Sequence, residues 1–245
     1  MKENRISTVV SNSFVTEDTF LLQVESPAEP KPGQFLMLTK PDGLLDPFLP
    51  RPISVFDWQD GVLSLLIRVV GKGTRILSGL KRGDRVRIVG YLGNSFPDST
   101  GKMLFIGGGI GVAPLFYAAK VALAKDRSFI LGFKNRGSVL MADRFSELGR
   151  LTVTTDDGSF GLHAFPHLVL KERLESGDLP DVICTCGPKV MMNCVADVVK
   201  SYSGIELYQS YESRMACGIG ACLGCRIETP GGSYLVCKEG PVFKV

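Results

Sequence analysis

Four cysteines near the end of this 245-residue chain limit its possible folds more than any other feature. Cys217, Cys222, Cys225 and Cys237 fall within 21 residues, although the chain has only 7 cysteines in all. The first three follow a C-x4-C-x2-C pattern, in which a loop wraps a [2Fe-2S] cluster and a distant fourth thiolate completes the ligand set. A segment this short cannot bury a core of its own, so we expect bound metal to order it.

The alternative for these cysteines is a structural zinc ion. Zinc sites with four cysteine ligands usually contain two C-x2-C pairs, whereas only Cys222 and Cys225 have that spacing here. Gly218, Gly220 and Gly224 lie between the ligands. Small residues let backbone N–H groups approach the sulfur atoms, which favours the cluster.

Charge and hydropathy exclude several other classes of protein. The 28 Lys and Arg residues and 25 Asp and Glu residues are spread along the chain, so we expect no nucleic acid partner. The longest uncharged run, residues 103–119, contains four glycines and a proline and predicts a strand, a turn and a helix start rather than a membrane span. The N-terminus lacks the apolar run of a secretory signal, which predicts a cytoplasmic protein with reduced thiols.

The patterning of the chain changes twice and predicts a multidomain β plus α/β fold. Residues 1–99 contain short β-branched runs separated by turns, which indicates an antiparallel Greek-key β-barrel. Residues 100–209 alternate buried strands with helices, which is typical of a parallel α/β nucleotide-binding sheet. Residues 210–245 form the small iron-sulfur module. The barrel strands are expected at residues 5–11, 19–25, 34–39, 53–58, 62–70 and 85–91, with a helix over 74–80.

Three groups of residues in the predicted barrel suit a phosphate-bearing, planar ligand. An arginine can clamp a phosphate with two hydrogen bonds, and a following proline stiffens the strand. Free N–H groups at a helix start favour a pyrophosphate. The tetrapeptide Arg51, Pro52, Ile53, Ser54 is a weak signal alone, and it gains weight from Leu66, Ile67, Arg68 and from Gly73 with Thr74.

The second predicted domain has a glycine-rich loop between its first strand and first helix. This context suits a dinucleotide, although no clear acidic residue follows about twenty positions later to hold a ribose. The alternative is a turn that needs glycine only for strand–helix packing. The glycines are Gly107, Gly108, Gly109 and Gly111.

Cys186, Gly187 and Pro188 follow the last buried strand of this domain, where ligands of parallel sheets bind, so we expect them beside a nicotinamide. Cys184 and Cys186 also suit simple core packing, and Cys194 is expected in the core. His163 and His167 lack a third metal ligand nearby and are expected at the surface or in a helix cap. The chain contains no G-x-S-x-G elbow and no P-loop, so hydrolase and phosphotransferase chemistry lack their machinery.

In the order RPIS, GGGIGVAP and CGP, these motifs resemble the ferredoxin-NADP reductase superfamily over residues 1–209. Three further segments are similar to the electron-transfer subunits of bacterial dihydroorotate dehydrogenase B, so the resemblance covers essentially the whole chain. They are DDGSFG from Asp156, ESRMACGIGAC from Glu212 and VCKEGPVF from Val236. The gap of 11 residues before Cys237 is shorter than in ordinary plant-type ferredoxins and matches these subunits.

This resemblance implies an oxidoreductase subunit of pyrimidine biosynthesis. It implies FAD at Arg51–Ser54, Leu66–Arg68, Gly73 and Thr74, the cluster at the four cysteines, and NAD at the glycine loop and Cys186–Pro188. It also implies an FMN-containing dihydroorotate dehydrogenase catalytic subunit as partner, with two copies of each chain in a heterotetramer. Electrons would pass from that FMN through the cluster to FAD and leave as hydride to NAD+, since flavins exchange one or two electrons. No side chain is expected to act as an acid or base.

Three alternatives stay open at this point. A related FAD and [2Fe-2S] subunit could serve a ferredoxin:NAD(P)H oxidoreductase or a hydrogenase. A non-enzymatic zinc-binding interaction module could use the same reductase-like scaffold. Arg136, after the second strand of the α/β domain, could meet a 2′-phosphate and leaves the choice between NAD and NADP undecided.

Overall fold

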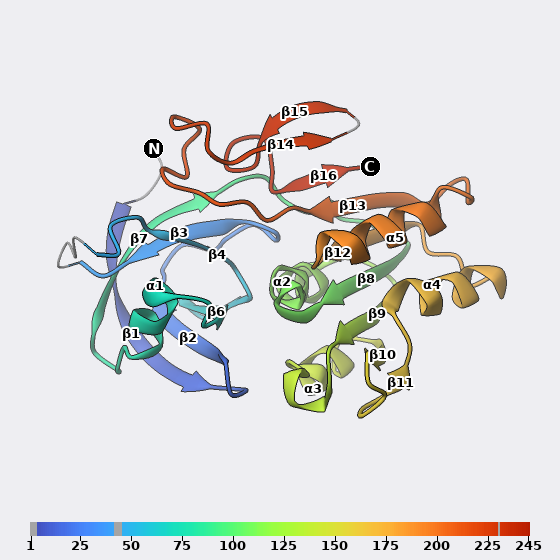
Figure 1. Ribbon diagram of the computed structural model, residues 1–245, viewed down its shortest axis with the longest axis horizontal. Coiled ribbons are helices and arrows are strands. Elements are labelled where there is room, and N and C mark those ends of the chain that lie inside the picture. Colours follow the sequence, from blue (N-terminus) through green and yellow to red (C-terminus); the bar gives the residue numbers. More distant parts are fainter. Residues whose placement is uncertain (1–3, 42–45, 230) are drawn as a thin grey trace. The chain divides into compact units, whose positions relative to one another are not determined.

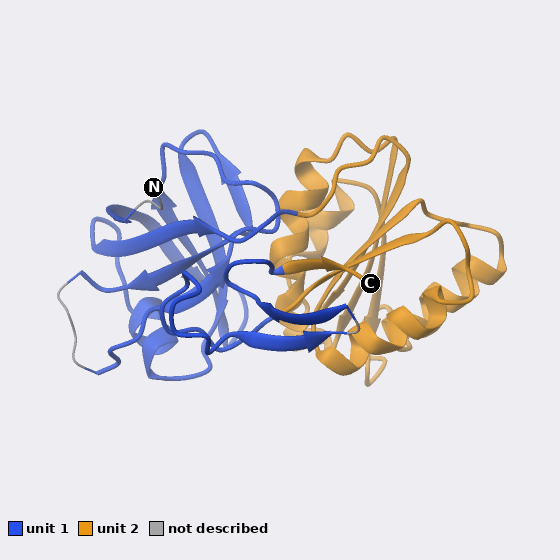
Figure 2. Ribbon diagram, turned by 90° about the horizontal axis from the view of Figure 1, so that it is seen from above, with its two compact units in different colours: residues 1–95, 212–241 blue, residues 96–211, 242–245 orange. Residues whose placement is uncertain are grey.

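The computed structural model describes residues 4–41, 46–229 and 231–245. The chain divides into two compact units, and each contains two separate stretches of sequence (Figure 2). Unit 1 contains residues 1–95 and 212–241, and unit 2 contains residues 96–211 and 242–245. In the part of the chain that is described, no helix is long and apolar enough to cross a membrane.

Unit 1 is built around a seven-stranded sheet in which every neighbouring pair is antiparallel. Its strand order is β4-β3-β7-β1-β2-β6-β5. Alternate side chains point inward, so that Phe20, Leu22 and Val24 of one strand are all fully buried. The strands are β1 (Asn4–Phe14), β2 (Thr19–Glu25), β3 (Phe35–Thr39), β4 (Arg51–Ser54), β5 (Asp57–Gln59), β6 (Val62–Arg68) and β7 (Arg85–Leu92) (Figure 1).

The two edge strands of this sheet, β4 and β5, follow one another directly in the chain. The prediction of one continuous strand over 53–58 is therefore wrong, because the chain changes partners in the middle. The Val55 N–H donates to the Gln34 carbonyl at 3.0 Å, and the Phe56 N–H donates to the Ser64 carbonyl at 3.1 Å. The short connection thus hydrogen bonds to both edges, as expected for a barrel.

A short helix, α1 (Lys72–Ser78), connects β6 to β7. Its last carbonyl groups lack partners within the helix, which is costly where the end is covered. The Asn12 side chain supplies them, since its Nδ2 donates to the carbonyls of Leu77, Ser78 and Leu80 at 3.1, 3.1 and 2.9 Å. This contact fixes α1 against β1, and the helix starts two residues earlier than the sequence indicates.

The C-terminal part of unit 1 contains a hairpin that the sequence analysis did not anticipate, formed by β14 (Arg226–Thr229) and β15 (Gly232–Leu235). The segment after the hairpin is attached to the end of β7. The Asn94 N–H donates to the Gly240 carbonyl at 2.7 Å, and the Asn94 side chain donates to the Glu239 carbonyl at 3.0 Å. Residues 212–241 therefore pack with the barrel sheet.

Unit 2 contains a second seven-stranded sheet of order β11-β10-β9-β8-β12-β13-β16. All neighbours are parallel except β13 and β16, which are antiparallel. The strands are β8 (Lys102–Gly108), β9 (Asp126–Phe133), β10 (Arg150–Thr155), β11 (Leu162–His163), β12 (Val182–Cys186), β13 (Glu206–Ser210) and β16 (Val242–Lys244). The purely parallel sheet predicted for this region is thus extended by one antiparallel edge strand from the end of the chain.

Helices cover both faces of this sheet (Figure 1). On one face, side chains of α4 and α5 surround a core that includes Leu104, Ile183 and Val195. On the other face, Phe116 of α2 and Phe145 of α3 meet edge to face, with ring centroids 5.2 Å apart. The helices are α2 (Ala113–Val121), α3 (Ala142–Ser146), α4 (Pro166–Glu175) and α5 (Lys189–Val199), with short 3-10 turns at η1 (Gly109–Val112) and η2 (Arg136–Ser138).

The order in which strands are added to the sheet of unit 2 reverses direction at one point, between β8 and β12. From β8 the chain proceeds outward through β9 and β10, and it then returns to add β12 on the other side of β8. The connections after β8 and β12 therefore lead to helices on opposite faces of the sheet, α2 and α5. Such a topological switch point is where open α/β sheets bind their ligands. The predicted fold class, an antiparallel barrel followed by an α/β sheet, is confirmed.

Candidate functional site

The hairpin of unit 1 explains the spacing of the last two cysteines. Cys225 immediately precedes β14, and one residue separates the end of β15 from Cys237. The register pairs Arg226 with Leu235. The two sulfur atoms consequently lie 3.2 Å apart, and both residues are buried. Of the 11 residues between them, Arg226–Thr229 and Gly232–Leu235 form the two strands of the hairpin.

The first two cysteines form a second pair near the surface. The N–H groups of Ile219 and Cys222 both donate to the Cys217 sulfur at 3.4 Å. The hydrogen bond from the Ile219 backbone is the main reason why the pKa of Cys217 falls to about 6, and Cys222 adds to the effect. Burial and the neighbouring Cys225 raise the pKa of Cys237 to about 11.

The four thiols are therefore arranged as two pairs. Each sulfur of a pair is close to its own partner, and Cys217 and Cys237 interact electrostatically across the pairs. Within residues 4–41, 46–229 and 231–245, no three His, Cys, Asp or Glu side chains converge on a single point. In the second pair, the Cys237 N–H donates to the Cys225 sulfur at 3.5 Å. Two sulfur pairs, each with backbone N–H donors, fit a cluster of two iron atoms better than one tetrahedral ion.

The loop that carries these cysteines rests directly on the barrel. Gly218 has φ +68°, and a Cβ atom at this position would lie 2.7 Å from Cγ of Met37 and 3.0 Å from Cδ1 of Leu92. Only glycine permits this approach with that backbone conformation. The cysteine loop, residues 217–225, is thus attached to strands β3 and β7.

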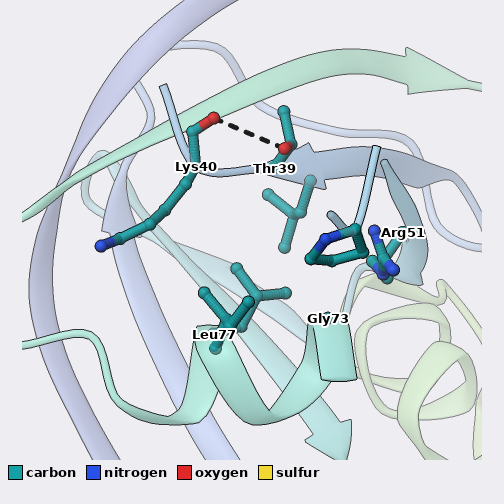
Figure 3. Close-up of a pocket in the computed structure, with 8 residues that line it drawn as sticks. Thr39, Lys40, Arg51, Gly73 and Leu77 are labelled. Carbon is teal, nitrogen blue, oxygen red and sulfur yellow. Dashed lines mark hydrogen bonds between the residues drawn. The ribbon is translucent and has the colours of Figure 1, made fainter. Parts of the chain in front are cut away.

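A pocket on the barrel lies beside Arg51 and Gly73, two of the residues that the sequence analysis selected (Figure 3). A Cβ atom on Gly73 would lie 1.8 Å from Nε of Arg51, so the guanidinium lies directly over the first turn of α1. That turn contains no acidic residue. The pocket is lined by Leu38, Thr39, Lys40, Pro47, Arg51, Gly73, Ile76 and Leu77.

The other residues selected in the barrel differ in what they can offer to a ligand. Pro52, Ile53 and Ser54 continue β4 and are half-buried. Leu66 and Ile67 are buried in the core, whereas Arg68 at the end of the same strand is exposed.

The Thr74 hydroxyl is used within the protein. It accepts hydrogen bonds from the N–H groups of Val70 and Gly71 at 2.9 and 3.2 Å, and it donates to the Gly71 carbonyl at 3.1 Å. Thr74 therefore shapes the start of α1.

In unit 2 the structure brings together the two segments selected as nucleotide-binding. A Cβ atom on Gly111 would lie 2.5 Å from the Cys186 carbonyl oxygen and 2.6 Å from Cα of Gly187. Similarly, a Cβ atom on Gly108 would lie 2.8 Å from Cδ of Pro188. The glycine loop and the CGP segment thus lie against each other at the topological switch point.

The individual glycines of this loop have different surroundings. Gly107 faces Val112 and Leu115 within the core, which is the strand–helix packing considered as the alternative. Gly109 has φ +54° with no atom within 4 Å of a Cβ position, so it is the open turn of the loop. The packing interpretation therefore applies to Gly107, whereas Gly109 leaves room for a ligand and the dinucleotide interpretation stays a prediction.

In the described part of the chain, the remaining cysteines and histidines belong to no group of three metal-ligating side chains. Cys184 is fully buried in β12, and burial raises the pKa of its thiol far above the usual range. Cys194 is half-buried on α5. His163 is exposed on β11, and the ring of His167 stacks on Phe165 with centroids 6.0 Å apart.

The sequence analysis missed several residues of these sites. Lys40 and Pro47 line the pocket beside Arg51, but neither belongs to a recognisable sequence motif. The N–H group of Ile219 reaches a cysteine sulfur, which no side-chain pattern can reveal. The sequence Pro-Gly-Gly after Thr229 is a turn signal and could have predicted the hairpin.

Comparison with known proteins identifies relatives over the whole length. Residues 212–245 match the family "Iron-sulfur cluster binding domain of dihydroorotate dehydrogenase B". The chain is 39% identical over 247 residues to the dihydroorotate dehydrogenase B (NAD(+)) electron transfer subunit of Clostridium acetobutylicum, covering 99% of this chain and 96% of that protein. It is also 39% identical to the same subunit of Caldanaerobacter subterraneus, covering 96% of this chain and 94% of the relative.

Solved structures share the fold of this chain. The structure of an NADH-dependent reduced ferredoxin-NADP oxidoreductase, described for flavin-based electron bifurcation, superposes with a TM-score of 0.86 at 29% identity. That match covers 100% of this chain and 90% of the other chain. A ferredoxin NADP+ reductase from Neisseria gonorrhoeae with bound FAD and NADP shares the fold, with a TM-score of 0.68 at 15% identity over 86% of this chain and 100% of that chain. The chain belongs to the family of dihydroorotate dehydrogenase B (NAD+) electron transfer subunits.

Proposed function

We propose that this subunit binds FAD and a [2Fe-2S] cluster and carries electrons from the FMN of a dihydroorotate dehydrogenase catalytic subunit to NAD+, in pyrimidine biosynthesis. The cluster supplies one-electron transfer, and FAD converts single electrons into the hydride that NAD+ accepts. The observation that carries the proposal is the arrangement of four thiols as two pairs, with 3.2 Å between the sulfurs of Cys225 and Cys237.

In this proposal the four cysteines hold the cluster, and the backbone of their loop adjusts its potential. The N–H groups of Ile219 and Cys222 already point at the Cys217 sulfur. Hydrogen bonds of this kind stabilise negative charge on the sulfur atoms, and they favour the reduced cluster.

Arg51 is proposed to hold the pyrophosphate of FAD. Its guanidinium lies over Gly73, where a side chain on residue 73 would collide with it. Two N–H groups of a guanidinium match two phosphate oxygens, and the free N–H groups of the first turn of α1 add to the attraction. Pro52–Ser54, Leu66–Arg68 and Thr74 are proposed to shape the rest of the flavin site.

Gly107, Gly108, Gly109 and Gly111 are proposed to receive the pyrophosphate of NAD+, with Cys186, Gly187 and Pro188 beside the nicotinamide. The support is their mutual contact at the carboxyl ends of β8 and β12. In this arrangement the protein binds and orients the nucleotide, and no side chain is required to transfer a proton.

The partner is proposed to be an FMN-containing catalytic subunit, assembled as a heterotetramer of two copies of each chain. The test is to express the two chains together, purify the complex and measure iron, acid-labile sulfide, FAD and FMN in it. We expect two irons and two sulfides for each FAD, and mass measurement should give two copies of each chain. Zinc in place of iron and sulfide would contradict the proposal.

A related function, as a subunit of a ferredoxin:NAD(P)H oxidoreductase, is favoured by one observation, the TM-score of 0.86 with a structure of that kind at 29% identity. The same purification separates the two functions. Dihydroorotate should reduce the FAD of the assembled complex if the proposal is correct. Reduction by reduced ferredoxin but not by dihydroorotate would favour the related function.

A further inference from the structure

The position of the glycine loop indicates where the adenosine half of the dinucleotide lies in unit 2, and this inference rests on the proposed function. The nicotinamide end is assigned to β12, and the sheet order continues from β8 to β9 and β10 on the opposite side. A dinucleotide that crosses the switch point therefore extends its adenosine over the carboxyl ends of β9 and β10.

These two strand ends carry opposite charges. In nucleotide-binding sheets of this kind, an acidic residue after the second strand holds the 2′-hydroxyl of NAD, and an arginine there accepts the 2′-phosphate of NADP. Here the residues after β9 include Lys134 and Arg136, both exposed and both cationic. The carboxylates, Asp156 and Asp157, come instead after β10.

Ser159 connects the segment after β9 with the segment after β10. The Arg136 N–H donates to the Ser159 hydroxyl oxygen at 2.8 Å, and the Ser159 hydroxyl donates to Oδ1 of Asp157 at 2.6 Å. The Ser159 N–H donates to the same oxygen at 3.0 Å. One serine thus holds the Asp157 carboxylate close to the backbone of Arg136.

Aromatic packing fixes the arginine as well. The Arg136 guanidinium lies over the ring of Phe160, 5.5 Å from its centroid. The Phe160 backbone is itself fixed, because its N–H and carbonyl both bond to the Thr155 hydroxyl, at 3.1 and 2.8 Å. The Asp157 carboxylate and the Arg136 guanidinium are therefore both positioned by contacts within or with residues 155–160.

We propose that Asp157, held by Ser159, makes this subunit select NAD over NADP, and that Arg136 opposes this selection. The Asp157 carboxylate can accept a hydrogen bond from a ribose 2′-hydroxyl. A 2′-phosphate carries nearly two negative charges and is repelled by the same carboxylate. The carboxylate that the spacing after the glycine loop did not provide is supplied by the next strand.

The test measures binding of two probes, ADP-ribose and its 2′-phosphate, by calorimetry on the assembled complex. Wild-type protein should bind ADP-ribose more tightly. Asp157→Asn should reduce that preference about 10-fold, as expected for removing one ionised group that faces a dianionic phosphate. Ser159→Ala should act in the same direction with a smaller effect, because the carboxylate is then free to move.

Asp156→Asn is the matched control, since it removes a neighbouring exposed carboxylate that is not bonded to Ser159. It should leave the preference unchanged. Arg136→Ala in the Asp157→Asn background should remove the affinity gained for the 2′-phosphate. An equal effect of both asparagine variants, or no change with Asp157→Asn, would overturn the proposal, as would a wild-type protein without preference.

Failure of this inference is distinguishable from failure of the proposed function. Anaerobic titration of the complex with NADH reports flavin reduction without reference to the 2′ position. If NADH reduces the FAD while Asp157→Asn leaves the preference unchanged, only the assignment of Asp157 is wrong. If NADH does not reduce the FAD of the wild-type complex, both the function and the inference are wrong.

Discussion

The cysteine loop of unit 1 and the glycine loop of unit 2 are both rich in glycine, but they are held by different forces. In residues 107–111, Gly108 and Gly111 bring backbone and side chains of β12 and α5 into close contact. In residues 217–225, the defining contacts run from backbone N–H groups to sulfur, and Ala221 to Gly224 are exposed. Packing holds the first loop without a ligand, whereas we expect the exposed part of the second, around Cys222, to depend on what its sulfurs bind.

The largest effect that tests this comparison is the loss of a cluster ligand. Cys222→Ala should abolish the cluster completely, because the exposed sulfur is a proposed cluster ligand and contributes no core packing. NADH affinity and NADH-to-dye activity should persist, since unit 2 holds its own loop. Iron analysis, flavin absorbance and dye reduction check this result.

Cys194→Ala, on a helix of unit 2, is the control for this experiment and should retain the iron. Loss of FAD together with the cluster in Cys222→Ala would contradict the expectation. It would show that the cysteine loop and the barrel form one cooperative folding unit, through contacts such as that between Gly218 and Met37.

The next effect concerns a site in unit 1 that does not involve the cysteine loop. Arg51→Ala should weaken FAD binding by about 10- to 150-fold, because a charge-assisted phosphate contact worth about 1.5 to 3 kcal/mol disappears. Arg75→Ala removes the same charge from the exposed face of α1 and is the matched control. Equal FAD dissociation constants for the two variants would remove Arg51 from the site.

A smaller effect is expected when the packed loop of unit 2 is overfilled. Gly111→Ala introduces a methyl group 2.5 Å from the Cys186 carbonyl oxygen, so the two loops must separate. Overpacking of this kind costs about 1 to 3 kcal/mol of stability. NADH affinity should fall by about 10-fold, corresponding to ~1.4 kcal/mol.

Gly177→Ala separates lost stability from lost function. Gly177 has φ +83° with no atom within 4 Å of a Cβ position, so alanine there costs about 1 to 2 kcal/mol of backbone strain alone. Thermal melting should show a loss for both variants, and NADH titration should show a loss only for Gly111→Ala. Weakened NADH binding in Gly177→Ala would mean that general destabilisation explains both results.

The smallest effect is the response of unit 2 to acid. Partial burial opposes ionisation of Asp178, but hydrogen bonds and charge from Arg173 and Arg150 outweigh burial and lower its pKa below the ordinary 3.8. Stability from this carboxylate is therefore complete above that ordinary value, and it is lost as the pH falls through the lower folded pKa. The contribution should be below about 1 kcal/mol because the pair is partly exposed.

Melting temperatures of Asp178→Asn and wild-type protein should therefore differ at neutral pH and converge in strong acid. Asp197→Asn is the control, because its ion pair with Lys200 is exposed. The iron content of the cysteine loop should be the same in all three proteins at neutral pH. A parallel loss of iron in Asp178→Asn would show that unit 2 and the cysteine loop do not respond independently.

Much of the fold could be predicted because its signals are local. The alternation of strands and helices after residue 100 and the short runs before it are visible in the sequence, and the elements agree to within a few residues. The break at Val55 and Phe56 was missed because both residues are apolar and buried, and nothing local shows that the chain changes partners there. The pairing of β16 with β13 was missed because it joins distant segments.

The sites divide in the same way. The cysteine spacing and the motifs around Arg51, Gly111 and Cys186 are read directly from the chain. The contact of Gly111 with Cys186 depends on strand order, and the connection of Arg136 to Asp157 through Ser159 depends on two strands lying side by side. The sequence showed Arg136 alone and therefore left the choice of nucleotide open.

By itself, the sequence determined which residue types are available at fixed spacings: four thiols, an arginine suited to a phosphate and glycines that tolerate close approach. These properties are chemical and local, so they can be recognised without a structure. The tertiary structure alone decided how the thiols pair, which strands meet at the switch point and which carboxylate lies beside Arg136. Those relations depend on contacts between residues far apart in the chain. Such contacts are fixed by the burial of both faces of the sheet, which requires all strands to be in place.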